Sequence, residues 1–224
     1  MGITERKERE KEHRKEEIID AAQKVFFEKG LTTATMDEIA EAAELSKGTL
    51  YLYYKSKEDM YLAVMMRGME VLYKIYEPIV ASEGSTIQQL VKFGDTYKEF
   101  FRSHRNFFRM FHFLQVQQFH KQVSEEMRQA CSVESRKMWD LVIGLFQHAI
   151  DEKLVRFGLN PVELAIILWS SSTALMLRTD AEREFWKERM QVDLAETLEL
   201  SNSLFLSSML TDKGRNELEM ISHR

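Results

Sequence analysis

The stretch TMDEIAEAAELSKGTLYLYYKSKED, residues 35–59, decides the fold because it contains the start signals of three successive helices. Thr35 can cap the N-terminus of the first helix, and Glu38, three residues later, completes a capping box. Ser46 is a good N-cap for a second, short helix, and Ser56 for a third. The stretch therefore predicts a helix, a tight turn, a short helix and the beginning of another helix.

The second of these helices, predicted over 47–53, carries Lys, Gly, Thr and Tyr residues. Lys55 and Lys57 follow it, and no acidic residue stands between Ser46 and Lys57. A short helix that begins with small, hydrogen-bonding residues and is surrounded by cations suits a DNA groove between two phosphate backbones. We therefore interpret the stretch as a helix-turn-helix.

A longer stretch around it, from Ile18 to Val64, reads IIDAAQKVFFEKGLTTATMDEIAEAAELSKGTLYLYYKSKEDMYLAV. It resembles, without a gap, the N-terminal domain of the tetracycline-repressor (TetR) family of bacterial transcription regulators. The segment SKGTLYLYYKSKED, which begins at Ser46, is the most specific part of this match. The resemblance covers roughly the first quarter of the chain, and the remainder is similar in architecture only.

This resemblance implies DNA contacts around the second helix of the motif. Gly48 lets the backbone approach the base pairs because it has no Cβ. Tyr51 offers a hydroxyl to phosphate oxygens, but it serves equally well as a packing residue. Lys57 adds its charge to the free N–H groups of a helix N-terminus, which favour a phosphate. The full set of expected DNA-binding residues is Thr35, Ser46, Lys47, Gly48, Thr49, Tyr51, Tyr53, Lys55 and Lys57.

Composition favours an all-α chain of one or two domains with a real core. The 224 residues are 44% hydrophobic, with only 2 Pro and 9 Gly. One cysteine excludes an intramolecular disulfide, and without a signal peptide we expect the cytoplasm. No apolar run is long enough for a membrane span. The net charge of -5 is compatible with DNA binding, because affinity follows the local potential.

We expect two domains, a helix-turn-helix DNA-binding head over 1–56 and a larger helical domain over 57–224 that binds an effector and dimerises. The first 17 residues form a charged arm of mixed sign, which we interpret as a solvated extension of the first helix. The alternative is contact with the DNA backbone through its Arg and Lys residues, and the interleaved Glu residues argue against strong binding. Apolar spacing predicts further helices: one from Ser56 to Tyr76, two within 86–119 separated at 104–106, one over 123–153, one from Pro161, and one over 193–210.

An aromatic-rich segment follows the head, and the chain also holds 13 Met. Aromatic and Met side chains can line an adaptable apolar pocket between helices. The alternative is that they form the core. The resemblance implies an effector pocket in this domain but identifies none of its residues. From the sequence we expect the pocket to be lined by Phe93, Tyr97, Phe101, Phe111, Leu114, Trp139, Val142 and Trp169.

The helix predicted from Pro161 is apolar nearly all round, which requires burial on two sides, and the helix over 193–210 has an apolar side as well. One side can pack on the chain's own core and the other on a second subunit, in a four-helix interface with two-fold symmetry. The alternative is a core within one chain. The expected interface residues are Ile166, Ser170, Thr173, Ala174 and Leu177 on the first helix, and Leu194, Leu198, Ser201, Phe205 and Met209 on the second.

No pattern indicates catalysis or a metal. His104, His112 and His120 are eight residues apart and so do not share one face of a helix. There is no HExxH motif, Cys pair or glycine-rich phosphate loop. We therefore expect no catalytic residue, metal or cofactor.

Together these observations predict an all-α homodimer that binds a palindromic double-stranded DNA operator and is released from it by a small, hydrophobic effector. Repression rather than activation follows from the resemblance alone. Two alternatives remain. One is a DNA-binding protein of this fold that a protein partner controls. The other is a helical enzyme with a vestigial head, against which the missing catalytic residues argue.

Overall fold

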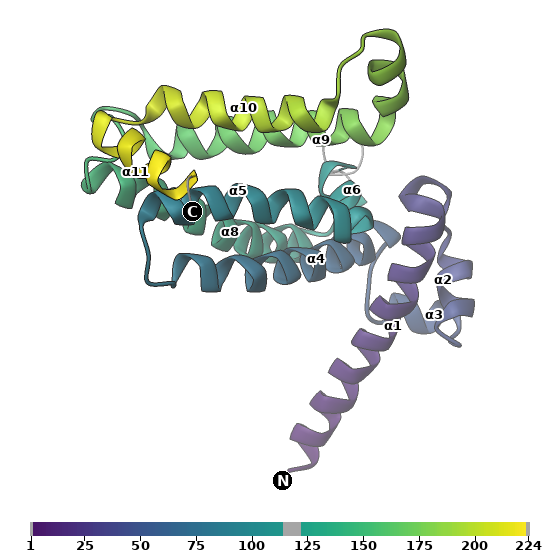
Figure 1. Cartoon of the computed structure of the whole chain (residues 1–224). Coiled ribbons are helices and arrows are strands. Elements are labelled where there is room, and N and C mark those ends of the chain that lie inside the picture. The colour runs from purple at the N-terminus through teal and green to yellow at the C-terminus, as the bar shows by residue number, and fades with distance from the viewer. Residues whose placement is uncertain (1, 114–121, 223–224) are drawn as a thin grey trace. The chain divides into compact units, whose positions relative to one another are not determined.

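The computed structural model of the chain describes residues 2–113 and 122–222, and within them every regular element is a helix (Figure 1). An isolated bridge joins Val155 and Leu210. The predicted all-α class is confirmed. The helices are α1 (Ile3–Thr33), α2 (Met36–Ala42), α3 (Lys47–Tyr51), α4 (Lys57–Val80), α5 (Thr86–Ser103), α6 (Arg105–Phe113), α8 (Glu125–Asp151), α9 (Pro161–Arg189), α10 (Leu194–Met209) and α11 (Asp212–Ser222).

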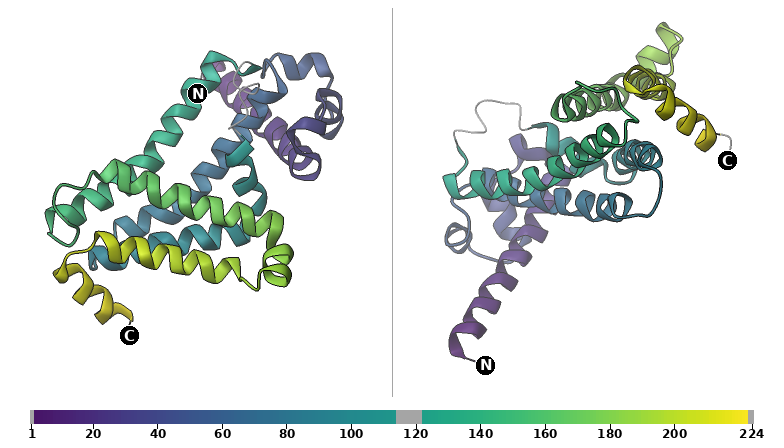
Figure 2. Two further views of the ribbon diagram at one scale, coloured as in Figure 1. Left: turned by 90° about the horizontal axis from the view of Figure 1, so that it is seen from above. Right: turned by 90° about the vertical axis from the view of Figure 1, so that its left-hand side faces the viewer.

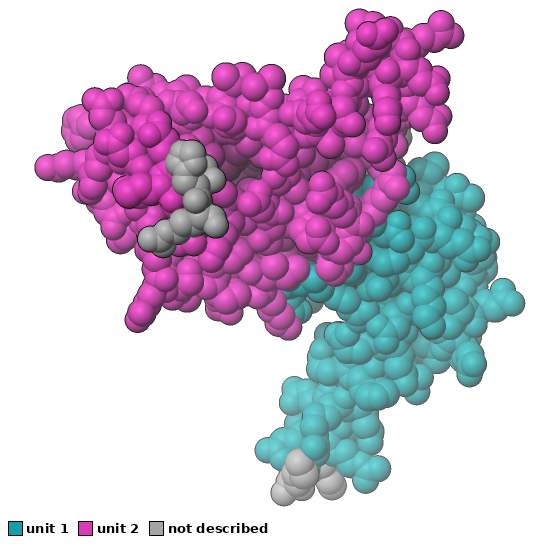
Figure 3. All heavy atoms as spheres, in the orientation of Figure 1, with its two compact units in different colours: residues 1–71, 106–135 teal, residues 72–105, 136–224 magenta. Residues whose placement is uncertain are grey.

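The chain divides into two compact units, which Figure 3 shows in different colours. Unit 1 comprises residues 1–71 and 106–135, and unit 2 comprises residues 72–105 and 136–224. Unit 1 therefore holds the predicted head together with the first part of α4, α6 and the start of α8. Helices α4 and α8 each contribute residues to both units.

The core of unit 1 forms around one face of α1. Ile18, Ala22 and Phe26 are four residues apart and buried, as expected for one side of a helix. The ring of Phe26 meets the edge of Tyr61 from α4 at 5.2 Å between centroids. Gly30 has φ 73°, a region that favours glycine, and it interrupts α1 near its end.

Helix α6 packs closely on α4 within unit 1. A Cβ added at Gly68 would lie 2.5 Å from the ring of Phe107, so any larger residue would require Phe107 or one of the two helices to shift. Phe107 also meets Phe27 of α1 edge to face, at 5.0 Å. The head is thus attached to helices that come much later in the sequence.

Unit 2 contains the end of α4 together with α5, most of α8, α9, α10 and α11. Tyr76 and Phe93 stack with their ring centroids 3.7 Å apart, and Phe100 and Phe146 are fully buried. Asn160 caps α9 and Pro161 opens it, as predicted. Helices α9 and α10 run side by side in opposite directions (Figures 1 and 2).

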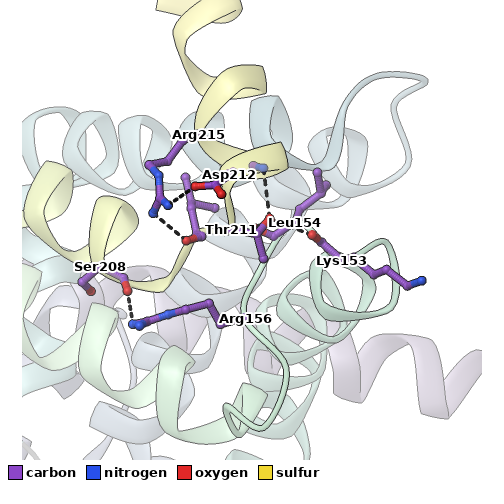
Figure 4. Close-up of polar contacts among 9 residues, drawn as sticks. Lys153, Leu154, Arg156, Ser208, Thr211, Asp212 and Arg215 are labelled. Atoms are coloured by element: carbon purple, nitrogen blue, oxygen red, sulfur yellow. Dashed lines mark hydrogen bonds and ion pairs between the residues drawn. The ribbon is translucent and has the colours of Figure 1, made fainter.

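Helix α11 was not predicted from the sequence, and hydrogen bonds hold it beside the loop after α8 (Figure 4). Thr211 donates its backbone N–H to the carbonyl of Leu154 at 2.9 Å, and its hydroxyl donates to that of Lys153 at 2.8 Å. The same hydroxyl accepts the N–H of Gly214 at 3.2 Å and so caps α11. A Cβ at Gly214 would overlap the carbonyl of Leu154, so glycine permits this close approach.

None of the helices within 2–113 and 122–222 combines the length and apolar composition that crossing a bilayer requires.

Candidate nucleic-acid interface

Helix α2 begins with the predicted capping box. Thr35 accepts the N–H of Glu38 on its hydroxyl at 3.2 Å, and Glu38 accepts the N–H of Thr35 at 2.9 Å. Lys29 adds an ion pair to Glu38 at 2.8 Å. The hydrogen bond from Lys29, followed by those from Thr35, lowers the pKa of Glu38 to about 2. The start of α2 is therefore fixed by three neighbouring residues, Lys29, Thr35 and Glu38.

Helix α3 is capped by Ser46, as predicted. The Ser46 hydroxyl accepts the N–H of Thr49 at 3.1 Å and lies 2.8 Å from the Thr49 hydroxyl. Glu44, in the turn before it, has φ 54°, which is uncommon for a residue with a side chain. Helix α3 ends at Tyr51, two residues earlier than the predicted end at Tyr53.

The start of α3 faces solvent. Gly48 is exposed, and a Cβ there would meet only the Ser46 hydroxyl, at 3.7 Å. Tyr51 is 49% exposed, whereas the neighbouring Leu50 is fully buried. Leu50 is therefore the packing residue of this helix, and the Tyr51 side chain is open to a partner.

The three lysines of the motif have different surroundings. Lys47 pairs with Asp37 at 2.9 Å, and the hydrogen bond to Asp37 raises the pKa of Lys47. Lys55 is exposed and has no ion pair or hydrogen bond within the described part of the chain. Lys57 donates to the carbonyls of Leu31 at 2.8 Å and Ala34 at 2.7 Å.

The Lys57 contacts show a role that the sequence analysis missed. The Lys57 ammonium joins the first turn of α4 to the last carbonyls of α1, which a helix leaves without partners inside itself. Lys57 is thus part of the frame that holds the head together. Its contact with a phosphate remains a prediction.

Leu52 is a second residue that the sequence analysis did not single out. Its side chain is 80% exposed, directly after α3. It follows buried Leu50 by two positions, a step that turns about 200° around a helix, to the opposite side. The position of Leu52 on the side opposite to buried Leu50 is the sequence signal by which its exposure could have been predicted. An exposed apolar side chain there suits the methyl group of a thymine.

The predicted effector residues are mostly in unit 2. Phe93, Tyr97 and Val142 are buried, and Trp139 meets Trp169 edge to face at 5.5 Å between centroids. The Tyr97 hydroxyl lies 2.9 Å from that of Thr173, and burial raises the pKa of Tyr97 to about 12. These contacts link α5, α8 and α9.

The remaining predicted effector residues are placed differently. Phe101 is half-buried in unit 2, whereas Phe111 is half-buried in unit 1. Leu114 lies outside the described residues. Trp169 is 38% exposed, so one side of its ring is open to solvent. The pocket itself remains a prediction.

The predicted dimer residues fall into three groups by burial. Thr173, Leu194, Leu198 and Met209 are buried inside one chain. Leu177, Ser201 and Phe205 are half-buried, and Ile166, Ser170 and Ala174 are exposed. The exposed apolar residues of α10 are instead Leu200 and Leu204, which the sequence analysis did not name. Several predicted residues of α10 thus lie on its inward face.

The chemistry of these units offers little to a metal. Among the residues that the structure describes, no three His, Cys, Asp or Glu side chains gather closely enough to hold an ion. The thiol of Cys131 is partly buried, which raises its pKa and lowers its reactivity.

Residues 18–64, which include the capped α2, the turn and the exposed α3, match the family model "Bacterial regulatory proteins, tetR family". Residues 18–64 are thus a DNA-binding domain of the TetR type. The TetR-type head is 40% identical over 62 residues to the HTH-type transcriptional activator FasR of Mycolicibacterium smegmatis, covering 28% of each chain. It is 36% identical over 84 residues to the HTH-type transcriptional repressor KstR2 of Rhodococcus jostii, covering 36% of this chain and 41% of that protein.

These matches span less than half of either relative's length. Structural likeness extends further along the chain. The regulator FadR from Bacillus subtilis, solved in complex with stearoyl-CoA, covers 86% of this chain and 98% of its own, with a TM-score of 0.64. At 20% identity this likeness concerns the fold alone.

Proposed function

We propose that this protein is a DNA-binding transcription regulator that binds a palindromic operator as a homodimer and is released by a small apolar effector. The observation that carries the DNA-binding part is the exposed start of α3, held in place by the caps at Thr35 and Ser46. Gly48 there leaves room for a duplex, and Tyr51 and Lys55 offer a hydroxyl and a cation to phosphates.

A homodimer supplies the second head that a palindrome needs. Two recognition helices read half-sites about 34–36 Å apart, one helical turn of DNA. Exposed apolar side chains on α9 and α10 support a shared interface there: Ile166 is 47% exposed, Leu200 59% and Leu204 61%. Covering these groups with the same face of a second copy removes apolar surface from water.

The effector part of the proposal concerns unit 2. Its aromatic side chains join three helices through the Trp139–Trp169 pair and the Tyr97–Thr173 hydrogen bond. A ligand with an acyl chain or an aromatic ring would find matching apolar partners between these helices. The complex of FadR with stearoyl-CoA shows that a protein of this fold can hold such a molecule.

Control of DNA binding then follows from linkage. Helices α4 and α8 each carry residues of both units, so a shift in one unit can reach the other through continuous helix. An effector that favours one arrangement lowers operator affinity by a coupling free energy of roughly 1–3 kcal/mol. We propose repression, with release on effector binding. KstR2 is named a repressor and FasR an activator, so a reporter assay must decide the sign.

The test is a panel of fatty acids, acyl-CoAs and aromatic compounds, scored for melting temperature and for release of a DNA duplex. A genuine effector raises the melting temperature and weakens DNA binding together. Trp139 and Trp169 supply a fluorescence signal in unit 2. A panel in which no compound shifts both readouts would favour control by a protein partner, with the DNA-binding part unchanged.

A further inference from the structure

Helix α1 begins well before its first buried residue. Ile18 is the first buried residue, and the side chains from Thr4 to Arg14 are exposed. At about 1.5 Å per residue this first half of α1 is a rod of roughly 20 Å, which we call the arm (residues 3–17). Figures 1 and 2 show it continuing past α2 and α3.

The charges of the arm are sorted around the helix, although they alternate along the sequence. Glu5, Glu8, Glu12 and Glu16 follow a spacing of three, four and four residues, which places them on one face. The cations Lys7, Lys11 and Arg14 follow a spacing of four and three, and form a second face. The Glu residues beside the cationic face are engaged by Arg side chains, since Glu10 pairs with Arg6 at 2.9 Å and Glu17 with Arg14 at 2.7 Å.

Contacts with α4 fix which way each face points. Arg67 of α4 pairs with Glu16 at 2.5 Å and with Asp20 at 2.6 Å, and donates to Gln23 at 3.1 Å. The end of the acidic face is thus held against α4 within unit 1. The cationic face is turned to another side.

That other side borders an open groove of about 700 Å³ in unit 1. Its lining includes five Arg and Lys residues of the arm and one acid, Glu10, which is paired with Arg6 at 2.9 Å. The lining also includes Tyr53, which follows α3. The groove therefore adjoins the surface that we expect to face DNA.

Two cations of the groove are available to a ligand. Lys7 and Lys11 are exposed and make no ion pair or hydrogen bond within the stretches that the structure describes. They are four residues apart, about 6 Å along the helix axis. One strand of DNA presents a phosphate about every 3.4 Å along its axis, so two phosphates can meet both lysines.

We propose that the arm is a second DNA-binding element, in which Lys7 and Lys11 bind the phosphate backbone beside the groove contacted by α3. The proposal rests on the proposed DNA-binding function and adds a contact outside the helix-turn-helix. An extended cationic face suits a charged polymer better than a single small anion. In a chain of net charge -5, such a local positive surface is what attracts DNA.

The test measures the salt dependence of DNA affinity for Lys7→Ala/Lys11→Ala. The probes are a duplex that the wild-type protein selects from a random-sequence pool and a shuffled duplex of the same composition. Each phosphate contact contributes about 0.9 to the slope of log affinity against log salt, and a homodimer carries two copies of each lysine, so the double variant should lose about 3.6 units of slope. Affinity should fall by a similar factor on both duplexes, because phosphate contacts carry no sequence information.

Lys11→Ala and Lys15→Ala form a matched pair, since Lys15 stands on the same helix but is paired with Glu12 at 2.9 Å and does not line the groove. Lys15→Ala should leave the slope unchanged. Glu10→Gln, which frees Arg6, should steepen it. A wild-type slope in the double variant would overturn the proposal, provided that the wild-type protein binds the selected duplex. Failure of the wild-type protein to bind any duplex would instead refute the proposed function.

Discussion

Replacing Lys57 by Met should loosen the head while removing one charge from its surface. Met keeps most of the apolar stem of Lys but cannot donate to the carbonyls of Leu31 and Ala34. Hydrogen bonds from a charged group contribute about 1.5–3 kcal/mol each, and two that share one partly buried ammonium contribute less than their sum. We therefore expect a loss of about 2 kcal/mol from the stability of this part of the head.

Amide hydrogen exchange followed by mass spectrometry measures that loss locally. Since each 1.4 kcal/mol is a factor of ten, peptides covering 31–45 should exchange roughly 30-fold faster. Lys55→Met is the matched control, because Lys55 is exposed and its replacement removes the same charge without breaking a contact of the described chain. Because a homodimer carries two copies of Lys55, this variant should lower the salt slope of DNA binding by about two units and leave exchange unchanged. Equal protection of 31–45 in both variants would refute the structural role of Lys57.

Other predictions address unit 2 and the α2 cap. Gly214→Val should lower the urea midpoint read by tryptophan fluorescence, with a cost of about 1–3 kcal/mol, because its side chain would overlap a backbone carbonyl. Gly144→Ala should raise the urea midpoint, because a Cβ at Gly144 meets no other atom and Ala favours a helix more than Gly. Equal midpoints for Gly214→Val and the wild-type protein would contradict the packing of α11. Leu200→Glu with Leu204→Glu should give monomers by light scattering, and a dimeric mass would refute the interface. The folded pKa of Glu38 is about 2, below its usual 4.5, so the Glu38 carboxylate stabilises the folded protein above pH 4.5 and loses this effect as pH falls toward 2. The difference in melting temperature between the wild-type protein and Glu38→Gln should therefore be full above pH 4.5 and shrink toward pH 2. A difference that stays constant with pH would contradict the cap.

The head could be predicted in detail because its signals are local. The caps at Thr35 and Ser46 require only a hydroxyl and the next turn of backbone, so the sequence placed α2 and the start of α3 correctly. The break between α5 and α6 at His104 was likewise visible in the sequence.

The remaining features depend on contacts between distant segments. To predict the role of Lys57, one must know where the carbonyls of residues 23 and 26 positions away lie in space. To predict how α11 packs, one must know that Gly214 lies beside the loop after α8. The side of α10 that faces the core could not be predicted from the sequence either. Apolar residues stand on both sides of that helix, so their spacing does not reveal which side packs on α9.

The central claim is that the exposed start of α3 binds DNA, and Gly48→Asp tests it most directly. The free head should tolerate the change, because a Cβ at Gly48 meets only the Ser46 hydroxyl at 3.7 Å and a carboxylate near a helix N-terminus is favourable. On DNA, the new side chain occupies the approach of the duplex and places a negative charge near phosphates, at a cost of several kcal/mol. Fluorescence anisotropy with the selected duplex should show an affinity loss of more than about 100-fold, with circular dichroism and dimer mass unchanged. Near-wild-type affinity in a folded Gly48→Asp protein would contradict the account.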